Sequence, residues 1–525
     1  MAVETSGAGA VDSPTAPDEN VVTRVRQGRL RGDSEQGALV FRGVPYASPP
    51  VGPLRFAAPR PPEPWSGTRR ATEFGPPFVQ PIMPGSEDAL YANVWTPGLG
   101  GRRPVFVYIH GGEWRLNTAT DPTYDGARLA VRGQMVVVTF NYRLGPFGFG
   151  LHEQLADSTG GCSNWGLQDQ AALIEWVRDN IAAFGGDPDN ITVCGTSAGG
   201  SSAWQLARLP HLRPTIRRII PISAGHIWSP PYTLEPEDSR TAFEEVAAQL
   251  GVTVAGLRDL PAEEVSRAWE GCFEGPPERR VVGSGRIYRG PVVDGHTVFG
   301  FDASDPVPDV PIMAINTHTE GSFFTRFTAP SPQDDHELAG MVGSLLRLAS
   351  DGVGRDLVDD VVEHYRAAAR RRGEPTDPLS LYTEIYGDSL LRHQIVRLAE
   401  RAAAENDSAV YHMDFAFPAR APHFGTPHEA TAPFLFGTCA VAGNAEVFGD
   451  GPRQRLVSDI FVDLVSSFAH RDVPSSSLAP RWPGFSPHRE STMLLGGDDP
   501  ARVTAVPKYE VLRFWDRIGW GPPRP

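Results

Sequence analysis

A serine lies between two glycines at a point where the hydrophobic pattern of the chain changes. The run Ile191–Cys194 is β-branched and apolar, the next five residues are GTSAG with Ser197 in the middle, and the residues that follow permit a helix. A G-x-S-x-G motif between a strand and a helix predicts a nucleophile elbow, a strained turn that presents the serine hydroxyl. Such a hydroxyl can attack an acyl carbon when a base and an oxyanion site lie nearby.

Several longer motifs resemble those of one enzyme family. They occur in the family's order and read FRGVPYA at residues 41–47, PPVGPLRF at 49–56, SEDALY at 86–91 and NYRLG at 141–145. With the serine motif, they make almost the whole chain after residue 20 similar to the type-B carboxylesterase and lipase family, which includes para-nitrobenzyl esterases and cholinesterases. The resemblance implies an α/β-hydrolase fold and serine-dependent hydrolysis of carboxylic esters. It also implies that no metal or organic cofactor takes part.

A glycine-rich loop follows another apolar run. Val105–Ile109 ends in the sequence HGGEW at residues 110–114, which resembles the loop that supplies oxyanion donors in this fold. Carried over by position, the backbone N–H groups of Gly112, Glu113 and Ala198 are expected to meet at the carbonyl oxygen as it gains charge. Each such donor can be worth about 10²–10³ in rate.

The acid and the base are expected after the serine, in that order. NTHTEGSFF at residues 316–324 resembles the family's acid loop and places Glu320 in that role. PHEATAPFLFG at residues 427–437 resembles the pattern that begins H-G-A-E and places His428 as general base and acid. His423, five residues earlier in the same loop, is the main rival for the base. His318, His226 and His110 are further candidates without a comparable motif.

The chain departs from the family's pattern where charge matters. Glu113 stands where members usually carry Gly or Ala, Thr196 replaces the Glu before the serine, and the histidine motif differs at Glu429, Thr431 and Ala432. One hypothesis is that Glu113 restores acidic charge to the pocket and holds a cationic or amine-bearing substrate. We favour the alternative, in which Glu113 is solvated or paired with an arginine.

Short apolar runs predict the elements that position these residues. Runs of this kind suit strands that are buried on both faces of a mostly parallel sheet. They are Val105–Ile109, Met135–Phe140, Ile191–Cys194, Ile219–Ile222, Val310–Ile315 and Ala409–Phe415. Apolar residues at three- to four-residue spacing predict a helix over Gly166–Phe184. Further helices are expected near 198–208, 240–250, 335–350, 354–371, 385–405 and 455–470. The fold class is therefore α/β, with helices on both sides of a central sheet and helical insertions around the active site.

Composition narrows the possible partners and compartments. The 525 residues carry 48 basic and 63 acidic side chains, a net charge of −15 that argues against nucleic acid and anionic membranes as partners. No apolar run approaches the roughly 18 residues of a membrane span. Residues 1–20 resemble a disordered leader and not a secretory signal, and residues 21–525 are expected to form one domain. Four scattered cysteines suit a reduced, cytoplasmic setting.

Aromatic residues beside the catalytic segments are expected to line an apolar substrate pocket. The candidate pocket residues are Trp114, Phe147, His226, Trp228, Phe323 and Phe324. The expected partner is a small-molecule ester, and the expected assembly is a monomer or a weak homo-oligomer. A lactonase, peptidase, amidase or acyltransferase with the same triad remains open. A non-catalytic binding module of the same fold is a less favoured alternative.

Overall fold

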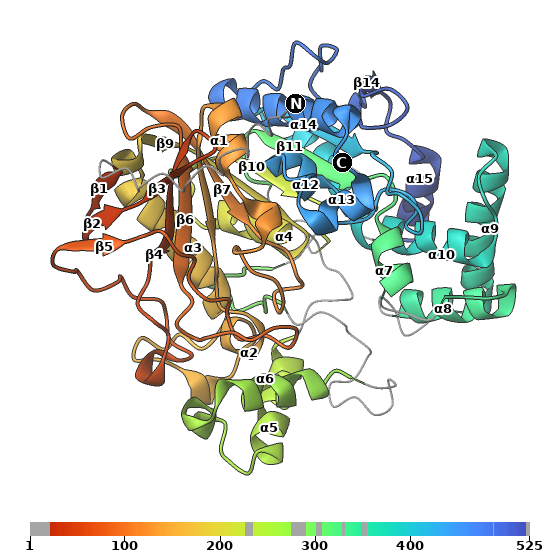
Figure 1. Cartoon of the computed structure of the whole chain (residues 1–525). Helices are drawn as coiled ribbons and strands as arrows, with labels where there is room; N and C mark the ends of the chain where they lie inside the picture. The colour runs from red at the N-terminus through yellow and green to blue at the C-terminus, as the bar shows by residue number, and fades with distance from the viewer. Residues whose placement is uncertain are drawn as a thin grey trace, which may run out of the picture.

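A large mixed sheet forms the centre of the molecule (Figure 1). The computed structural model describes residues 21–225, 235–274, 290–300, 307–327, 331–347, 354–486 and 488–520. The predicted leader, residues 1–20, lies outside the described residues. The eleven strands of the sheet follow the order β14 (Ala501–Thr504), β13 (Thr492–Leu495), β12 (Val410–Phe415), β11 (Ile312–Thr317), β10 (Ile216–Ile222), β9 (Gly186–Thr196), β7 (Arg103–Ile109), β8 (Val136–Phe140), β6 (Tyr91–Thr96), β4 (Ala38–Pro45) and β3 (Asp33–Glu35).

Strand direction divides this sheet into a centre and two edges. Every neighbouring pair from β8 through β7, β9, β10, β11 and β12 to β13 is parallel. The pairs at the two edges, β3 with β4, β4 with β6, β6 with β8, and β13 with β14, are antiparallel. A separate small sheet contains β1 (Val22–Val25), β2 (Gly28–Arg31) and β5 (Thr68–Arg70).

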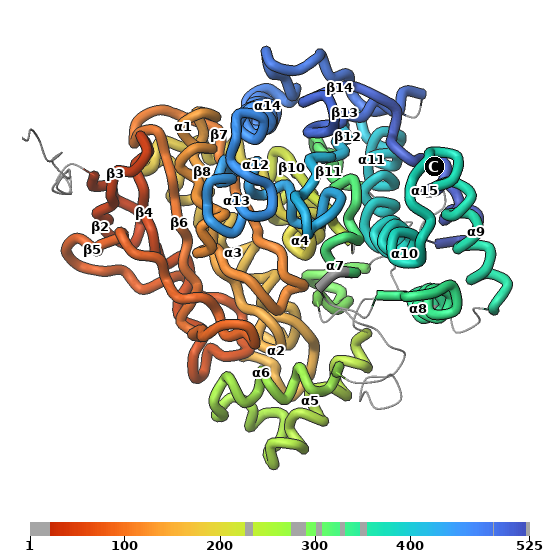
Figure 2. The backbone as a smooth tube through the Cα atoms, turned by 45° about the vertical axis from the view of Figure 1, so that its right-hand side comes forward, coloured from red at the N-terminus to blue at the C-terminus, as the bar shows by residue number. Residues whose placement is uncertain are grey.

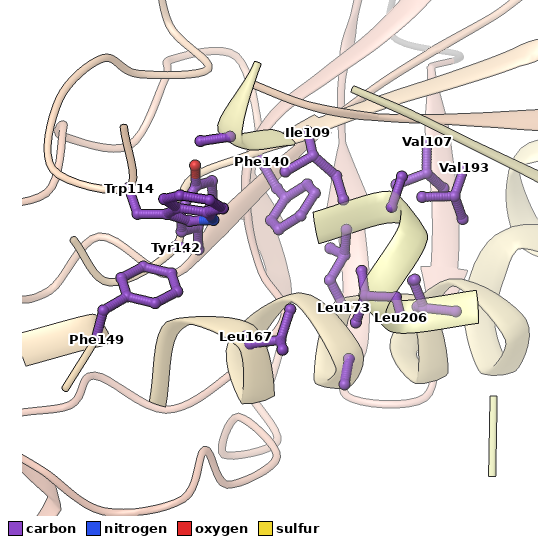
Figure 3. Packing of buried hydrophobic residues seen from close by; sticks show 14 of the residues in the cluster. Val107, Ile109, Trp114, Phe140, Tyr142, Phe149, Leu167, Leu173, Val193 and Leu206 are labelled. Atoms are coloured by element: carbon purple, nitrogen blue, oxygen red, sulfur yellow. The ribbon is translucent and has the colours of Figure 1, made fainter. Parts of the chain in front are cut away.

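Helices cover both faces of the sheet because its parallel strands alternate apolar side chains between two layers. In β7, Val105, Val107 and Ile109 join one hydrophobic cluster, whereas Phe106 and Tyr108 join another. The first cluster includes α3 (Trp165–Asn180), α4 (Ala198–Arg208) and α11 (His393–Glu405). Figure 3 shows Leu167 and Leu173 of α3 and Leu206 of α4 among the side chains of this layer. The second cluster includes α1 (Ala127–Gly133), α12 (Thr431–Phe436), α13 (Ala442–Phe448) and α14 (Pro452–Arg471).

Helical segments are inserted between the strands (Figures 1 and 2). The short α2 (Gly145–Gly148) contacts α6 (Ala262–Gly271), which lies with α5 (Pro236–Gln249) at the bottom of both views. A third hydrophobic cluster joins α7 (Gly321–Phe327), α8 (Asp335–Arg347), α9 (Arg355–Arg372), α10 (Pro378–Gly387) and α15 (Tyr509–Arg517). Among the described residues, no helix has both the length and the apolar composition that crossing a membrane requires.

The predicted helices exist, but several of their boundaries differ. The helix predicted over Gly166–Phe184 is α3 followed by a 3₁₀ turn at Ile181–Phe184. The helix predicted near 240–250 begins earlier, at Pro236, because proline suits the first turn of a helix. The segment predicted as one helix over 385–405 comprises the end of α10, a wide π turn at Asp388–Arg392 and α11.

Candidate active site

The parallel strands that carry the predicted site residues end at one level of the sheet. Their registers pair Ile109 of β7 with Gly195 of β9, Thr196 with Ile222 of β10, and Ile222 with Ile315 of β11. The loops that leave these ends therefore emerge together. They carry the predicted oxyanion donors, the predicted nucleophile and the predicted acid, at the edge where open parallel sheets bind their ligands.

Ser197 stands in a strained turn between β9 and α4. Its φ is +58° and its ψ is −125°, and its N–H donates to the carbonyl oxygen of Ile222 at 2.8 Å. A side chain on Gly199 would place its Cβ 2.1 Å from the carbonyl oxygen of Ile109, and one on Gly195 would place its Cβ 2.4 Å from Gly199. The two glycines are thus required by close backbone contacts, and the strain is localised at the serine.

The loop after β7 has three consecutive residues with positive φ. The angles are +104° for Gly112, +56° for Glu113 and +59° for Trp114. A Cβ on Gly112 would lie 2.3 Å from the carbonyl oxygen of Leu116, so this position needs glycine. Within the described part of the chain, the N–H groups of Gly112 and Glu113 have no acceptor. Ala198 is the first residue of α4, so its N–H has no acceptor in its own helix.

Glu113 is paired with an arginine. Its carboxylate accepts a hydrogen bond from Nε of Arg115 at 3.0 Å, and Arg115 also donates to the carboxylate of Glu270 at 2.8 Å. The Glu113 side chain is 31% exposed. This arrangement favours the arginine-paired alternative over a role for Glu113 as the acidic group of the pocket.

Glu320 and His428 form a buried pair. Oε2 of Glu320 lies 2.6 Å from Nδ1 of His428. Oε1 of the same carboxylate accepts hydrogen bonds from the hydroxyl of Ser223 at 2.6 Å and from the N–H of Thr317 at 2.8 Å. Both partners are almost inaccessible, with 1% exposure for Glu320 and 2% for His428. The three hydrogen bonds hold the carboxylate in one orientation toward the imidazole.

The imidazole of His428 is set up to accept a proton on its outer nitrogen. Burial opposes its protonation, but the charge and hydrogen bond of Glu320, together with the charges of Glu429 and Glu113, outweigh burial, so the pKa of His428 is raised. With Nδ1 donating to Glu320, Nε2 is free to accept. Nε2 is buried and has no hydrogen-bond partner among the described residues. The ring of Phe324 lies 5.0 Å from the imidazole.

The other candidate histidines that the structure describes have neighbours other than Glu320. Nδ1 of His318 lies 2.9 Å from the carboxylate of Asp414. His110 stacks on Tyr142 at 4.5 Å, and burial lowers its pKa to about 4. His423 lines a cavity beside the site, but the Glu320 carboxylate contacts His428.

That cavity has a volume of about 340 Å³ and adjoins the Glu320–His428 pair. Phe323, one of the candidate pocket residues, lies in its wall, and the Phe323 ring is 6.3 Å from the imidazole of His428. The wall also includes Glu429, the residue after His428. Oε1 of Glu429 and Cβ of Ser197 lie 3.3 and 3.1 Å from the point where a Cβ on Gly111 would stand.

Phe147 and Trp114, two other candidate pocket residues, do not line this cavity. Phe147 is 1% exposed and stacks on Phe56 at 5.4 Å, which makes it part of the hydrophobic core. Trp114 is 2% exposed, and its indole N–H donates to the hydroxyl of Ser202 at 3.0 Å. Its ring packs near Tyr142 and Phe149 (Figure 3). His226 and Trp228 lie outside the described residues.

Comparison with known proteins places the chain in a family. The model of the carboxylesterase family matches residues 18–515. The chain belongs to the carboxylesterase family. It is 31% identical to phenmedipham hydrolase of Pseudarthrobacter oxydans, over 94% of this chain and 99% of that protein. It is 30% identical to para-nitrobenzyl esterase of Bacillus subtilis (strain 168), over 91% of this chain and 95% of that one.

Solved carboxylesterase structures share this fold. A carboxylesterase of Geobacillus stearothermophilus superimposes with a TM-score of 0.78 at 31% identity, covering 94% of this chain and all of that one. A para-nitrobenzyl esterase structure gives a TM-score of 0.75 at 29% identity, covering 94% and 99%. The predicted α/β-hydrolase fold is confirmed, and this carboxylesterase is a carboxylic ester hydrolase.

Two parts of this site escaped prediction from the sequence. Ser223 follows β10 and contacts Glu320 across 97 residues of sequence, a contact that depends on the β10–β11 pairing. Glu429 was recognised as a departure from the family's pattern, but its position beside Gly111 was not foreseen. A polar residue directly after a buried parallel strand was the available signal for Ser223.

Proposed function

We propose that this carboxylesterase uses Ser197 as nucleophile, His428 as general base and acid, and Glu320 as the acid that orients His428. The observation that carries the proposal is the buried hydrogen bond of 2.6 Å between His428 and Glu320. The strained turn at Ser197 supports it, as do the N–H groups of Gly112 and Glu113, which have no acceptor among the described residues.

The reaction proceeds through an acyl-enzyme. Neutral His428 removes the proton of Ser197 through Nε2 as the serine oxygen attacks the ester carbon. The carbonyl oxygen becomes an oxyanion that accepts hydrogen bonds from the N–H groups of Gly112, Glu113 and Ala198. His428 then gives its proton to the leaving alcohol, and water hydrolyses the acyl-enzyme by the same route.

The carboxylate of Glu320 has two roles in this cycle. Its carboxylate keeps the proton of neutral imidazole on Nδ1, so Nε2 can accept the serine proton. It also stabilises the imidazolium that forms during attack, in agreement with the raised pKa of His428. The hydrogen bonds from Ser223 and Thr317 keep the carboxylate oriented while the imidazole changes charge.

Covalent labelling and turnover test the assignment. A fluorophosphonate is expected to modify Ser197 in the wild type, whereas a Ser197→Ala variant stays unlabelled and loses up to about 10⁶ in turnover on p-nitrophenyl acetate. His428→Ala should lose most turnover, and His423→Ala serves as the matched control. Labelling at another serine, or a larger loss in His423→Ala than in His428→Ala, contradicts the assignment.

Matched substrates test which bond the enzyme cleaves, ester or amide, and which acceptor takes the acyl group, water or an alcohol. Hydrolysis of p-nitrophenyl acyl esters but not of the corresponding anilides is expected of an esterase. Product analysis with and without an added alcohol distinguishes hydrolysis from acyl transfer. Preferred cleavage of the anilides, or preferred transfer to the alcohol, favours the amidase or acyltransferase alternative.

We also propose that the protein works in a reducing compartment, the cytoplasm, as a monomer or weak homo-oligomer. Four free cysteines, of which Cys194, Cys272 and Cys439 are buried, support the compartment. Fractionation of the source cells with thiol titration tests the location, and sedimentation tests the assembly. A secreted, disulfide-linked form contradicts the proposal.

A further inference from the structure

The cavity beside the Glu320–His428 pair is acidic as well as aromatic. Its wall contains Glu429 and Asp121 together with the rings of Tyr124, Phe323 and Phe448. Asp121 is exposed and marks the solvent side, whereas Glu429 lies deeper and is partly accessible through the cavity. The described residues that line it include no lysine or arginine. Phe424 adds a fourth aromatic ring, so a cation that enters meets two acidic side chains and four aromatic rings.

Among the described residues, no lysine or arginine forms an ion pair with the carboxylate of Glu429. It forms no hydrogen bond or ion pair with the described residues, in contrast to Glu113, whose charge is paired with Arg115. Burial raises the pKa of Glu429, and the charges of Glu320 and Asp121 raise it further, against the opposing effect of His428. An unpaired carboxylate in such surroundings is costly, and a bound cation would relieve that cost.

The location of the cavity indicates which part of an ester it holds. His428 delivers its proton to the leaving alcohol, so the alcohol oxygen must lie against the imidazole. The cavity wall includes Phe323, whose ring lies 6.3 Å from that imidazole, and Glu429, the next residue of the chain. The group attached to the alcohol oxygen can therefore extend into the cavity.

We propose that this cavity is the subsite for the alcohol part of the substrate, and that Glu429 selects alcohols that carry an ammonium group. The inference rests on the proposed function of Ser197, His428 and Glu320. The ammonium group forms a charge-assisted hydrogen bond with Glu429. The aromatic walls contact the hydrocarbon part and attract the cation through their faces. Asp121 increases the local concentration of cations at the solvent side.

A pair of esters that differ in charge but not in shape tests the proposal. The substrates are 4-(aminomethyl)benzyl acetate and 4-ethylbenzyl acetate, compared in the wild type and in Glu429→Gln. We expect the wild type to prefer the ammonium ester, and the variant to lose about 10- to 100-fold in kcat/KM on that ester. The loss should be mostly in KM, because Glu429 contacts the substrate in both the ground state and the transition state. Because the charge of Glu429 also raises the pKa of His428, both esters are compared at a pH above the acid limb, where the neutral ester should change much less than the ammonium ester.

Glu113→Gln is the matched control, since it removes a carboxylate that is already paired. It should leave the ratio of kcat/KM between the two esters unchanged. Benzylammonium provides a second readout: it should inhibit hydrolysis of the neutral ester competitively, and more weakly in Glu429→Gln than in the wild type.

Two results would overturn the subsite assignment. Equal losses on both esters in Glu429→Gln mean that Glu429 acts on the triad and not on the alcohol. Equal use of the two esters by the wild type, or hydrolysis of neither, means that the cavity does not select ammonium alcohols. A different result would contradict the proposed function itself: a fluorophosphonate that leaves Ser197 unmodified.

Discussion

Replacing Glu320 with glutamine tests how the carboxylate directs the imidazole. Oε1 of Glu320 accepts from both Ser223 and Thr317, whereas Oε2 faces only Nδ1 of His428. In Glu320→Gln, the two donors require the amide oxygen on their side. The amide nitrogen must then face Nδ1 and donate to it. This contact shifts the imidazole proton to Nε2, where it blocks removal of the proton of Ser197.

The expected loss follows from that change of tautomer. A tautomer error of this kind in a serine triad lowers kcat by about 10⁴, which corresponds to about 5.5 kcal/mol of transition-state stabilisation. Because Gln carries no charge, burial then dominates the titration of His428, and the acid limb of kcat/KM should move to lower pH. Fold stability should change much less than activity, since glutamine has the same shape.

Initial rates on p-nitrophenyl acetate from pH 5 to 9, with a urea titration of the same samples, measure both effects. Glu320→Asp is the control, because it retains the charge but shortens the reach to His428. It should retain more activity than Glu320→Gln. A Glu320→Gln enzyme within tenfold of the wild type, or an acid limb that moves to higher pH, refutes the assigned role of the carboxylate.

Three further outcomes follow from the same contacts. Ser223→Ala removes a buried donor to Glu320 and should lower the free energy of unfolding by about 1.5–3 kcal/mol; an unchanged urea midpoint contradicts this. Because the pKa of His428 is raised above 6.5, kcat/KM should rise with pH through a midpoint above 6.5, and a lower midpoint contradicts the pairing with Glu320. By linkage, the stability that His428 contributes is fully present below pH 6.5 and is lost as the pH rises through its folded pKa. Gly199→Ala places a Cβ 2.1 Å from the carbonyl oxygen of Ile109 and should lower stability by about 1–3 kcal/mol or more, with loss of turnover; wild-type stability and activity would contradict the close contact.

Much of the central sheet could be predicted because its strands are buried on both faces. Runs such as Val105–Ile109 and Met135–Phe140 are apolar except for Thr139 and correspond to β7 and β8. The two outermost strands, β3 and β14, were missed because they are short and carry polar residues. Asp33–Glu35, for example, has no apolar side chain and is a strand only through its pairing with β4.

The site was predictable where its chemistry is local in the sequence. The nucleophile turn needs Gly195 and Gly199 on either side of Ser197, so five consecutive residues indicate the structure. Ser223 differs, because its hydroxyl reaches Glu320 only after β10 and β11 have paired. Phe147 is predicted as a pocket residue because it lies near the site motifs in the sequence. In the structure it packs against Phe56 and belongs to the core. These contacts depend on tertiary structure and leave no local pattern.

The position of acidic charge is a further property that only the tertiary structure explains. The family pattern that this sequence resembles has Glu at the position of Thr196, whereas this chain has Thr196 there and a carboxylate at Glu429. The hydroxyl of Tyr108 donates to Oγ1 of Thr196 at 2.9 Å. Burial raises the pKa of Tyr108, and the charge of Glu429 acts in the same direction. Both positions therefore affect the same hydroxyl, although 233 residues separate them in the sequence.

A double-mutant cycle tests whether these positions substitute for each other. Thr196→Glu alone should place a second carboxylate near Glu429 and reduce stability through repulsion between like charges. Adding Glu429→Gly should recover part of that loss, with a coupling free energy of about 0.5–3 kcal/mol from urea unfolding of the four proteins. Thr196→Val, which removes the acceptor of the Tyr108 hydroxyl without adding charge, is the control and should show no such recovery. Strictly additive effects of Thr196→Glu and Glu429→Gly would mean that the two positions do not share one electrostatic environment, and that Glu429 does not replace the family's carboxylate.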